Sequence, residues 1–501
     1  MTSTTRGVER RTIDVVPASE RHGTPRSQFT LWFGANLQIT AIVDGALAVV
    51  FGADALWAIV GLLLGNVLGG AVMALHSAQG PKLGLPQMIS SRAQFGVYGA
   101  VIPLVLVVVM YLGFAATGSV LAGQALSEGL HLGAPKLGIV LFGVLTAVVA
   151  TLGYRYIHLM GKISTVVGIV GFTYLAIKIV ADYDVTSFFG TKGFDIVTFL
   201  LAISLGAGWQ LTFGPYVADY SRYLPADTPA TTTFRATFLG SVLGSQWSMT
   251  LGAIIASIPV TAGDPGFLGN QVGFMGDLAG GGFVALVIYL VIVCGKLAVN
   301  CLNAYGGLMT ILTTTSAFTR TSKVSQTTRA LLIAAFLATS VGIALFASAD
   351  FLDNFKNFVL VLLMVFTPWS AINLVDYYLV SRERVDVPAL YDPDGRYGRW
   401  NATALVSYAV GVVAQVPFLA QKLYTGPMTD ALGGADISWI VGLVVTAAVY
   451  YVWARRTANP PAETIPMPES VSGDSSGLAL VMVLPAAKRR YSSFRLGVRL
   501  A

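Results

Sequence analysis

Few residues of this chain could carry chemistry inside an apolar environment, and three of them lie on one segment. Lys296, Asn300 and Asn303 follow an apolar run that begins near Phe283. In a helix these positions are four and three residues apart, so their side chains share one face. A charge inside hydrocarbon costs roughly 2.5 to 3.5 kcal/mol on insertion scales and seldom persists without a polar cavity or a partner. We therefore expect this face to border a cavity rather than lipid.

The composition indicates which elements must position these residues. Of the 501 residues, 55% are apolar and only 11% are charged, and the mean hydropathy is +0.70. Water-soluble proteins of ordinary composition do not have these values. Apolar runs long enough to cross the roughly 30 Å hydrocarbon core recur along the chain. The sequence predicts an all-α integral membrane protein with twelve transmembrane helices, at about residues 29–53, 55–75, 99–124, 136–154, 158–181, 194–220, 236–259, 282–314, 328–348, 355–380, 402–421 and 436–455.

The positions of Lys and Arg predict the orientation, because basic residues near span ends resist translocation. With the N-terminus inside, most basic residues fall in inner segments, and the outer loops hold only Lys136, Lys192, Lys356 and Lys422. We expect a multi-pass protein of the plasma (inner) membrane with both termini in the cytoplasm. The net charge of +6 then reflects this asymmetry and not nucleic-acid binding. Residues 1–28 would form a cytoplasmic segment, and residues 457–501 a flexible cytoplasmic tail.

A repeated motif predicts how the helices are organised. Residues 33–40 read FGANLQIT and residues 205–212 read LGAGWQLT, so both carry Gly-Ala-x-x-Gln-x-Thr. Five predicted spans separate the copies, and the second copy therefore crosses the membrane in the opposite direction, as in an inverted repeat. Residues 29–181 and 194–380 would be two five-helix repeats, and residues 402–455 would hold helices 11 and 12 outside the symmetry.

The motif also predicts a break in each of the two helices that carry it. Small and polar residues at mid-membrane weaken regular helix packing, and unwound backbone is tolerated there only where protein or water can satisfy it. Two such breaks, one in each half, indicate a binding site near the midplane. The alternative interpretation is that Gly34, Gly206 and Gly208 are close-packing positions between helices.

Side chains around the expected breaks suit a flat, uncharged heterocycle. Gln38 and Asn303 are amides, which carry donors and an acceptor for the edge of such a ring. Trp209 and Phe114 offer aromatic surfaces for its two faces, and we expect Trp209 to lie inside the second break. The other polar residues of these two helices are Asn36, Thr40, Asp44, Gln210 and Thr212.

The chain resembles the nucleobase:cation symporter-1 family, in particular its purine/cytosine permease branch, to which hydantoin and allantoin transporters are related. The resemblance covers most of the chain and rests on the order and spacing of LWFGANLQ, GLPQMISSRAQFGVYG, GAGWQ, YVADYSRYLP, NCLNAYGG and VDYYLVSRER. It implies a LeuT-like core with a 5+5 inverted repeat, helices 1 and 6 broken, and two further C-terminal helices. It also implies symport of the substrate with sodium or protons by alternating access.

Roles for individual residues follow from the resemblance. Trp209 would stack on the substrate beside the Gly208 backbone, while Gln38 and Asn303 would hydrogen-bond it. Phe114 would supply the aromatic group of the third span. No catalytic residue is implied.

The resemblance further implies a sodium site made of the backbone carbonyls of Gly34, Leu37 and Cys294 and two hydroxyl groups of the eighth span. The hydroxyl positions fall on Leu297 and Ala298, so both of these oxygens are missing. Because a hard cation such as sodium requires oxygen ligands, this difference weakens the case for sodium.

Lys296 offers an alternative to a bound cation. An ammonium group near the cavity could take its place, and since burial disfavours the charged form, this lysine could release and take up a proton. Asp44 is the acid deep in the first span and could be its partner, and Asn300 is a third candidate for coupling. We therefore favour proton symport over sodium symport. A static ion pair, or a lysine that reaches toward the cytoplasmic rim, is a further interpretation.

The sequence thus predicts a secondary active transporter that imports cytosine or a purine, with no cofactor other than co-transported H⁺ or Na⁺. The alternative is Na⁺-coupled uptake of uracil, allantoin, a hydantoin or another planar heterocycle. A membrane enzyme or an ATP-driven pump is disfavoured, because metal-ligand spacing, a Ser/His/Asp arrangement and a GxxxxGK[ST] loop are all missing from the sequence. A passive channel leaves the paired breaks unexplained. The expected partners are the substrate and the lipid bilayer, without nucleic acid or an obligatory protein partner.

Overall fold

The apolar runs of the sequence form long helices in the computed structural model, which describes residues 14–152, 154–262, 266–318, 325–422 and 424–468. Residues 1–13 of the expected cytoplasmic segment and residues 469–501 of the expected tail lie outside the described residues. The described chain is helical apart from the two-residue strands β1 (Ala420–Gln421) and β2 (Tyr424–Thr425), which pair in one loop. The prediction of an all-α membrane protein is confirmed at this level.

Within the described residues, nine helices are long and apolar enough to cross a membrane, and the bent pair α1 and α2 makes a tenth span. These helices are α1 (Pro25–Asn36), α2 (Ile39–Val50), α3 (Ala55–Ser77), α7 (Val101–Leu130), α9 (Tyr154–Asp182), α10 (Ile196–Leu211), α12 (Ala230–Ala262), α15 (Gly282–Ser316), α16 (Gln326–Ala347), α17 (Phe351–Leu374) and α20 (Ser438–Thr457). Two shorter apolar helices, α8 (Pro135–Leu152) and α18 (Ala402–Gln415), lie where the sequence predicts spans 4 and 11. The count of twelve spans therefore stays a prediction.

Short helices and turns connect these spans. They are η1 (Ala18–Glu20), α4 (Gly80–Leu83), α5 (Gln87–Ser90), α6 (Arg92–Phe95), η2 (Val185–Phe188), η3 (Gly214–Tyr216), α11 (Ala218–Ser221), α13 (Gly266–Gly269), α14 (Gln271–Leu278), the π-helical turn η4 (Val375–Val380), η5 (Pro388–Tyr391), η6 (Val416–Phe418) and α19 (Pro427–Ala431).

The outer faces of the long helices carry large apolar side chains. Phe346 of α16 is 90% exposed and Phe283 of α15 is 78% exposed, and exposed Val and Leu side chains line α3, α7 and α8. Such a surface is too apolar for water and suits contact with lipid. Almost all of the polar side chains that the sequence places mid-span are buried. The residues that could bind a substrate or an ion therefore lie inside the bundle.

The first predicted break is present. α1 ends at Asn36 and α2 begins at Ile39, and the two helices are bent by 60° relative to each other. Between them Gln38 is extended, with φ −146° and ψ 155°. The prediction of interrupted helix within residues 33–40 is confirmed.

The second predicted break is absent, because residues 205–211 are regular helix. α10 is a regular helix from Ile196 to Leu211, so Trp209 lies inside its last turn and not in a break. The Thr212 hydroxyl donates to the Trp209 carbonyl at 2.6 Å, and the chain then continues through η3 and α11. Among the described helix pairs, only α1 and α2 show a bend above 40°, so the second span is interrupted without a matching bend.

Pro215 accounts for the position of this interruption. Proline has no N–H, and its ring clashes with the carbonyl four residues earlier, so Pro215 favours an end of the regular helix at Leu211, although Pro368 lies within α17. The glycines of the second motif copy have another function. A Cβ atom at Gly206 would lie 2.7 Å from the Leu62 carbonyl oxygen, and one at Gly208 would lie 2.9 Å from Val359 Cγ1. These two glycines are close-packing positions, as the alternative interpretation proposes.

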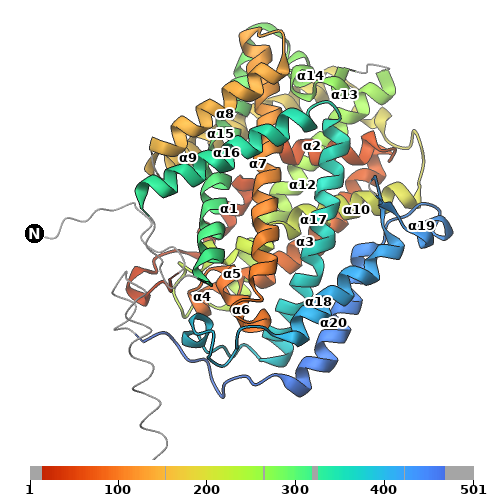
Figure 1. The fold of residues 1–501 in the computed structure, drawn as a ribbon. Helices are drawn as coiled ribbons and strands as arrows, with labels where there is room; N and C mark the ends of the chain where they lie inside the picture. Colours follow the sequence, from red (N-terminus) through yellow and green to blue (C-terminus); the bar gives the residue numbers. More distant parts are fainter. Residues whose placement is uncertain (1–13, 153, 263–265, 319–324, 423, 469–501) are drawn as a thin grey trace, which may run out of the picture.

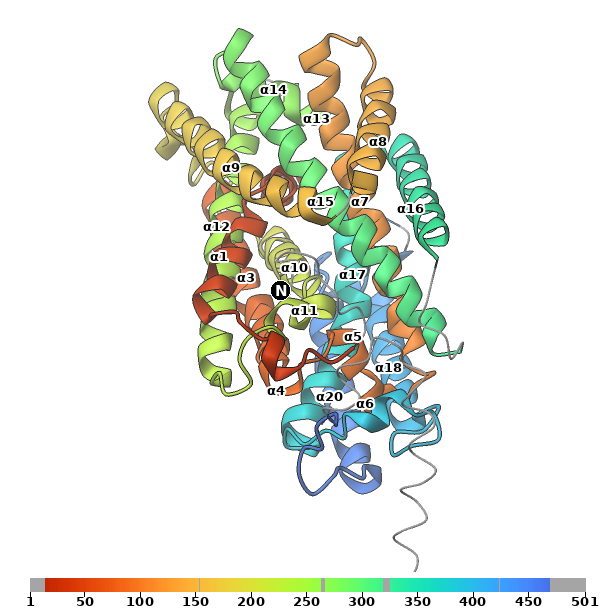
Figure 2. The same cartoon turned by 90° about the vertical axis from the view of Figure 1, so that its left-hand side faces the viewer.

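The helices pack in pairs that bring distant parts of the sequence together. α10 packs against α3, α12 packs against both α1 and α2, and α15 packs against α7. Figure 2 shows the long helices α15 and α9 crossing each other, and the two helices are in contact. α18 and α20 pack on each other and on α17, and Figure 1 shows them in blue along the outside of the bundle.

Both described chain ends lie at one end of the bundle. The Val16 N–H donates to the Gly84 carbonyl at 2.9 Å, near α4. The Ile465 N–H donates to the Val385 carbonyl at 2.9 Å, and the Val387 N–H donates to the Ile465 carbonyl at 3.0 Å. Residues 458–468 of the expected flexible tail are therefore docked, because their backbone pairs with the loop that follows α17.

Replacing Gly206 by Ala should destabilise the protein, because the added methyl group must displace the backbone of α3. We expect the free energy of unfolding to fall by about 1 to 3 kcal/mol. The measurement is the melting temperature of the protein purified in detergent. Gly342→Ala in α16 is the matched control, since nothing lies within 4 Å of the added Cβ atom there, and it should leave the melting temperature unchanged or slightly higher. Equal melting temperatures for Gly206→Ala and the wild type would contradict the close packing.

Candidate substrate and coupling site

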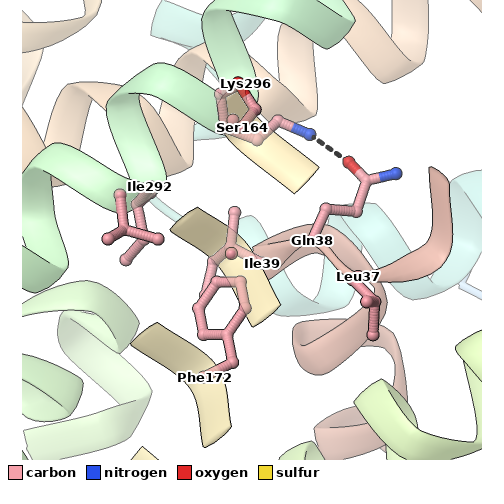
Figure 3. A pocket seen from close by; sticks show the side chains of 10 residues that line it. Leu37, Gln38, Ile39, Ser164, Phe172, Ile292 and Lys296 are labelled. Carbon is pink, nitrogen blue, oxygen red and sulfur yellow. Dashed lines mark hydrogen bonds between the residues drawn. The ribbon is translucent and has the colours of Figure 1, made fainter. Parts of the chain in front are cut away.

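The ammonium group of Lys296 lies at the break between α1 and α2. Lys296 is on α15 and is 2% exposed. Its Nζ donates to Gln38 Oε1 at 2.9 Å, which Figure 3 shows, and to Thr40 Oγ1 at 2.5 Å. Gln38 Nε2 in turn donates to the Ala35 carbonyl at 2.9 Å. The amide of Gln38 therefore connects the end of α1 to Lys296. Because Lys296 belongs to α15, these hydrogen bonds connect the break to α15.

A small cavity lies beside this ammonium group. In Figure 3 the side chains of Ile39, Phe172 and Ile292 lie on one side of it, while Lys296 and Gln38 lie above. Its lining comes from the break, from α9 and from α15: Leu37, Gln38, Ile39, Ser164, Gly168, Phe172, Val291, Ile292, Gly295 and Lys296. The cavity is lined by apolar side chains on one side and by the amine of Lys296 on the other.

Two of the three carbonyl groups expected to bind sodium, those of Gly34 and Cys294, accept hydrogen bonds. The Leu37 N–H donates to the Gly34 carbonyl at 3.1 Å, and Ser164 Oγ donates to the Cys294 carbonyl at 3.0 Å. Leu297 and Ala298 are buried apolar side chains at the expected hydroxyl positions. Lys296 Nζ lies at the same break, where it donates to Gln38 and Thr40 and to none of these residues.

Asp44 does not pair with Lys296 in this structure. The lysine donates to Gln38 and Thr40 instead, and both carboxyl oxygens of Asp44 are buried without a hydrogen-bond partner among the described residues. Thr40 and Asp44 are four residues apart on α2, so the carboxyl group lies one turn farther along the same face. The expected ion pair is therefore replaced by two neutral ligands, and the acid lies next to them.

The side chain of Trp209 extends from α10 to the end of α1. It is 2% exposed, and its indole N–H donates to Asn36 Oδ1 at 2.6 Å. The Trp209 ring meets Phe114 edge-on, with centroids 5.8 Å apart and planes 89° apart. The two rings predicted to cover opposite faces of a ligand therefore touch each other at right angles, an arrangement that aromatic pairs favour. In this conformation no flat ligand fits between them.

The polar face of α15 is buried, as predicted. Asn300 Nδ2 donates to the Ala115 carbonyl at 2.9 Å and to Ser119 Oγ at 3.2 Å, so this amide joins α15 to α7. Asn303 is 8% exposed, and its Nδ2 has no hydrogen-bond partner among the described residues. A donor of this kind is available to a ligand, whereas the donor of Asn300 is used within the protein.

An aromatic cluster that the sequence did not reveal follows α10. Phe213, Tyr216 and Tyr220 lie 5.4, 6.4 and 5.5 Å from Trp32 between ring centroids, and Tyr216 lies 5.4 Å from Tyr111. Their spacing of three and four residues is a signal that could have indicated one helical face. This aromatic cluster fills the space between Trp209 and the end of the bundle that carries both termini.

Comparison with known proteins identifies the family. A family model described as "Permease for cytosine/purines, uracil, thiamine, allantoin" matches residues 15–442. The Bacillus subtilis protein named "Putative purine-cytosine permease YxlA" is 37% identical over 446 residues, which cover 89% of this chain and 95% of that protein. The purine-cytosine permease fcyB of Emericella nidulans is 24% identical, over 88% of this chain and 87% of that protein.

Solved structures of Mhp1 share the fold. Its inward-facing conformation matches with a TM-score of 0.73 at 20% identity, over 94% of this chain and 98% of that chain. Its closed conformation with bromovinylhydantoin bound matches with a TM-score of 0.70 at 20% identity, over 93% and 99% of the two chains. Mhp1 is described as a nucleobase-cation-symport-1 family transporter. The family model and the bacterial relative both match most of the chain. This chain therefore belongs to the nucleobase:cation symporter-1 family, whose members are membrane permeases.

Proposed function

We propose that this protein is a secondary active transporter that imports cytosine or a purine together with protons, by alternating access. The observation that carries the proposal is the buried ammonium group of Lys296, which bridges the first break next to the predicted substrate residues. The purine-cytosine permeases among its relatives support the substrate class. We propose that the protein lies in the plasma membrane with both termini in the cytoplasm. The distribution of basic residues supports this orientation.

The substrate would bind between the three spans that carry Gln38, Trp209 and Asn303. The unpartnered Asn303 Nδ2 suits a ring carbonyl or ring nitrogen acceptor of a base. Trp209 would stack on one face of the base after Phe114 withdraws from its edge-on contact. Gly208 would contribute backbone only, because glycine has no side chain and α17 leaves no room for a Cβ atom at this position.

Coupling to protons would use Asp44 and Lys296. A buried carboxyl group without a partner is less costly in its neutral form than as an anion, so Asp44 is suited to carry a proton inward. When Asp44 releases this proton to water on the cytoplasmic side, the ammonium group of Lys296 on α15 would compensate the carboxylate, because its ligand Thr40 lies one turn before Asp44 on α2. Asn300 supports the arrangement by tying α15 to α7.

We also propose that residues 29–181 and 194–380 form two inverted repeats, with residues 402–455 outside them. The helix pairs support this relation. α1 of the first span packs on α12 of the seventh, and α10 of the sixth span packs on α3 of the second. A two-fold axis in the membrane plane would exchange these two pairs, and it would exchange α7 with α15, which pack on each other.

The proposed function is tested by uptake of radiolabelled cytosine into cells that lack their own permeases, in competition with a panel of unlabelled bases. We expect saturable uptake that cytosine and purines inhibit, that persists without sodium and that a protonophore abolishes. Uptake that requires sodium would favour the alternative coupling. Uptake that only allantoin or a hydantoin inhibits would favour the alternative substrates.

Replacing Lys296 by Met should lower accumulation of the substrate at least tenfold and weaken its dependence on external pH, because the charge that compensates ionised Asp44 is lost. The measurement is uptake at several external pH values, normalised to the amount of folded protein. Lys178→Met is the matched control, because Lys178 forms an exposed ion pair with Asp182 on α9. Full uptake with an unchanged pH dependence in Lys296→Met would remove this residue from the coupling.

Replacing Asn303 by Leu should raise the KM for the base about tenfold with little change in maximal rate, because one hydrogen bond to the substrate is lost. Asn354→Leu on α17 is the control, since its amide donates to the Ala347 carbonyl at an outer helix end. A KM for Asn303→Leu equal to that of the control would exclude Asn303 from the site.

A further inference from the structure

Asn36, to which the proposed function gives no role, joins the two interrupted spans. It is the last residue of α1 and is fully buried. Its Oδ1 accepts the indole N–H of Trp209 at 2.6 Å. Its Nδ2 donates to the Trp32 carbonyl at 2.7 Å and to Ser241 Oγ at 3.2 Å. Both ends of the amide are therefore used.

These contacts permit only one orientation of the Asn36 amide. A flipped amide would turn its NH2 group toward the indole N–H of Trp209, so that two donors would face each other. The Asn36 carbonyl of the main chain is also held, since it accepts the Gln38 N–H at 3.0 Å and the Ser248 hydroxyl at 2.8 Å. Because an indole has a single N–H, a fixed acceptor for it also fixes the rotation of the ring.

A chain of buried polar side chains lies behind Asn36. Ser241 Oγ donates to Gln210 Oε1 at 2.6 Å, and Gln210 Nε2 donates to Asn66 Oδ1 at 3.0 Å. These residues come from α12, α10 and α3, and each is at most 1% exposed. Buried polar networks whose members are satisfied rigidify the structure around them. The position of Asn36 is thus set by three helices besides its own.

We propose that Asn36 is a positioning residue, which holds the plane of the Trp209 indole ring in the orientation that stacks on the substrate. Ser241, Gln210 and Asn66 hold Asn36 in turn. This inference rests on the proposed function, because only that function assigns Trp209 to the substrate. A ring that is fixed before binding loses less conformational entropy when the substrate arrives, so the effect of Asn36 falls on substrate affinity.

The test is a double-mutant cycle between Asn36→Leu and Trp209→Phe, measured as the KM of cytosine uptake. Trp209→Phe keeps an aromatic ring but has no N–H for Asn36 to accept. In the wild-type background, Asn36→Leu should raise the KM about tenfold with a maximal rate within about twofold. In the Trp209→Phe background, the same substitution should add less than about twofold. If the two single effects multiply in the double variant, Asn36 does not act through Trp209 and the proposal is overturned.

The matched control is Ser248→Ala, which removes a hydrogen bond to the main chain of Asn36 but leaves its side-chain contacts in place. Its KM should stay within about twofold of the wild-type value. The amount of folded protein is measured by fluorescence-detected size exclusion for every variant. If Asn36→Leu does not fold, Ser241→Ala replaces it in the cycle, because it removes one of the two acceptors of the Asn36 amide. A smaller effect with the same dependence on Trp209 is expected.

A second readout needs no substrate and separates this proposal from the proposed function. Purified protein labelled with 5-fluorotryptophan gives one ¹⁹F resonance for Trp209, identified by its loss in Trp209→Phe. This resonance should be narrow in the wild type and in Ser248→Ala, and it should shift and broaden in Asn36→Leu. An unchanged resonance in Asn36→Leu overturns the proposal, whether or not the wild type takes up a base. Absence of base uptake by the wild type counts against the proposed function alone.

Discussion

The break between α1 and α2 depends on the hydrogen bonds that the ammonium group of Lys296 makes there. Backbone that leaves the helix at membrane depth needs polar groups around it, and a buried charge needs ligands. Here the residues of the break supply the ligands of the lysine, and the lysine supplies the polar group that the break needs. Gln38 accepts from the lysine with one end of its amide and donates to the Ala35 carbonyl with the other, while Thr40 supplies the second acceptor. The polar residues of α2, the bend after α1 and the lysine of α15 therefore form one arrangement.

The two copies of Gly-Ala-x-x-Gln-x-Thr show how strongly surroundings decide the function of a motif. In the first copy, Gln38 and Thr40 lie at the bend and bind a charge. In the second copy, Gln210 lies within a regular helix and belongs to a polar network, and Thr212 donates to the carbonyl of its own helix end. The glycines of the second copy serve close packing. The sequence motif is repeated, but the local chemistry is not.

Much of the fold could be predicted from the sequence, because apolar length and period require only local information. The first bend and the buried face of α15 followed from polar residues in apolar runs. The motif wrongly predicts a break within residues 205–211, because its small residues serve close packing in a regular helix. The docking of residues 458–468 and the ligands of Lys296 depend on partners far along the chain. So does the perpendicular contact of Trp209 with Phe114. No local pattern specifies such partners.

The aromatic cluster beyond Trp209 has a thermodynamic consequence. Phe213, Tyr216 and Tyr220 present their rings to Trp32, so a movement that opened this part of the bundle would separate them. Separation brings their apolar faces into contact with water. Exposure of apolar surface to water raises the heat capacity. The free-energy difference between a closed and an open conformation would therefore depend on temperature along a curve and not along a straight line.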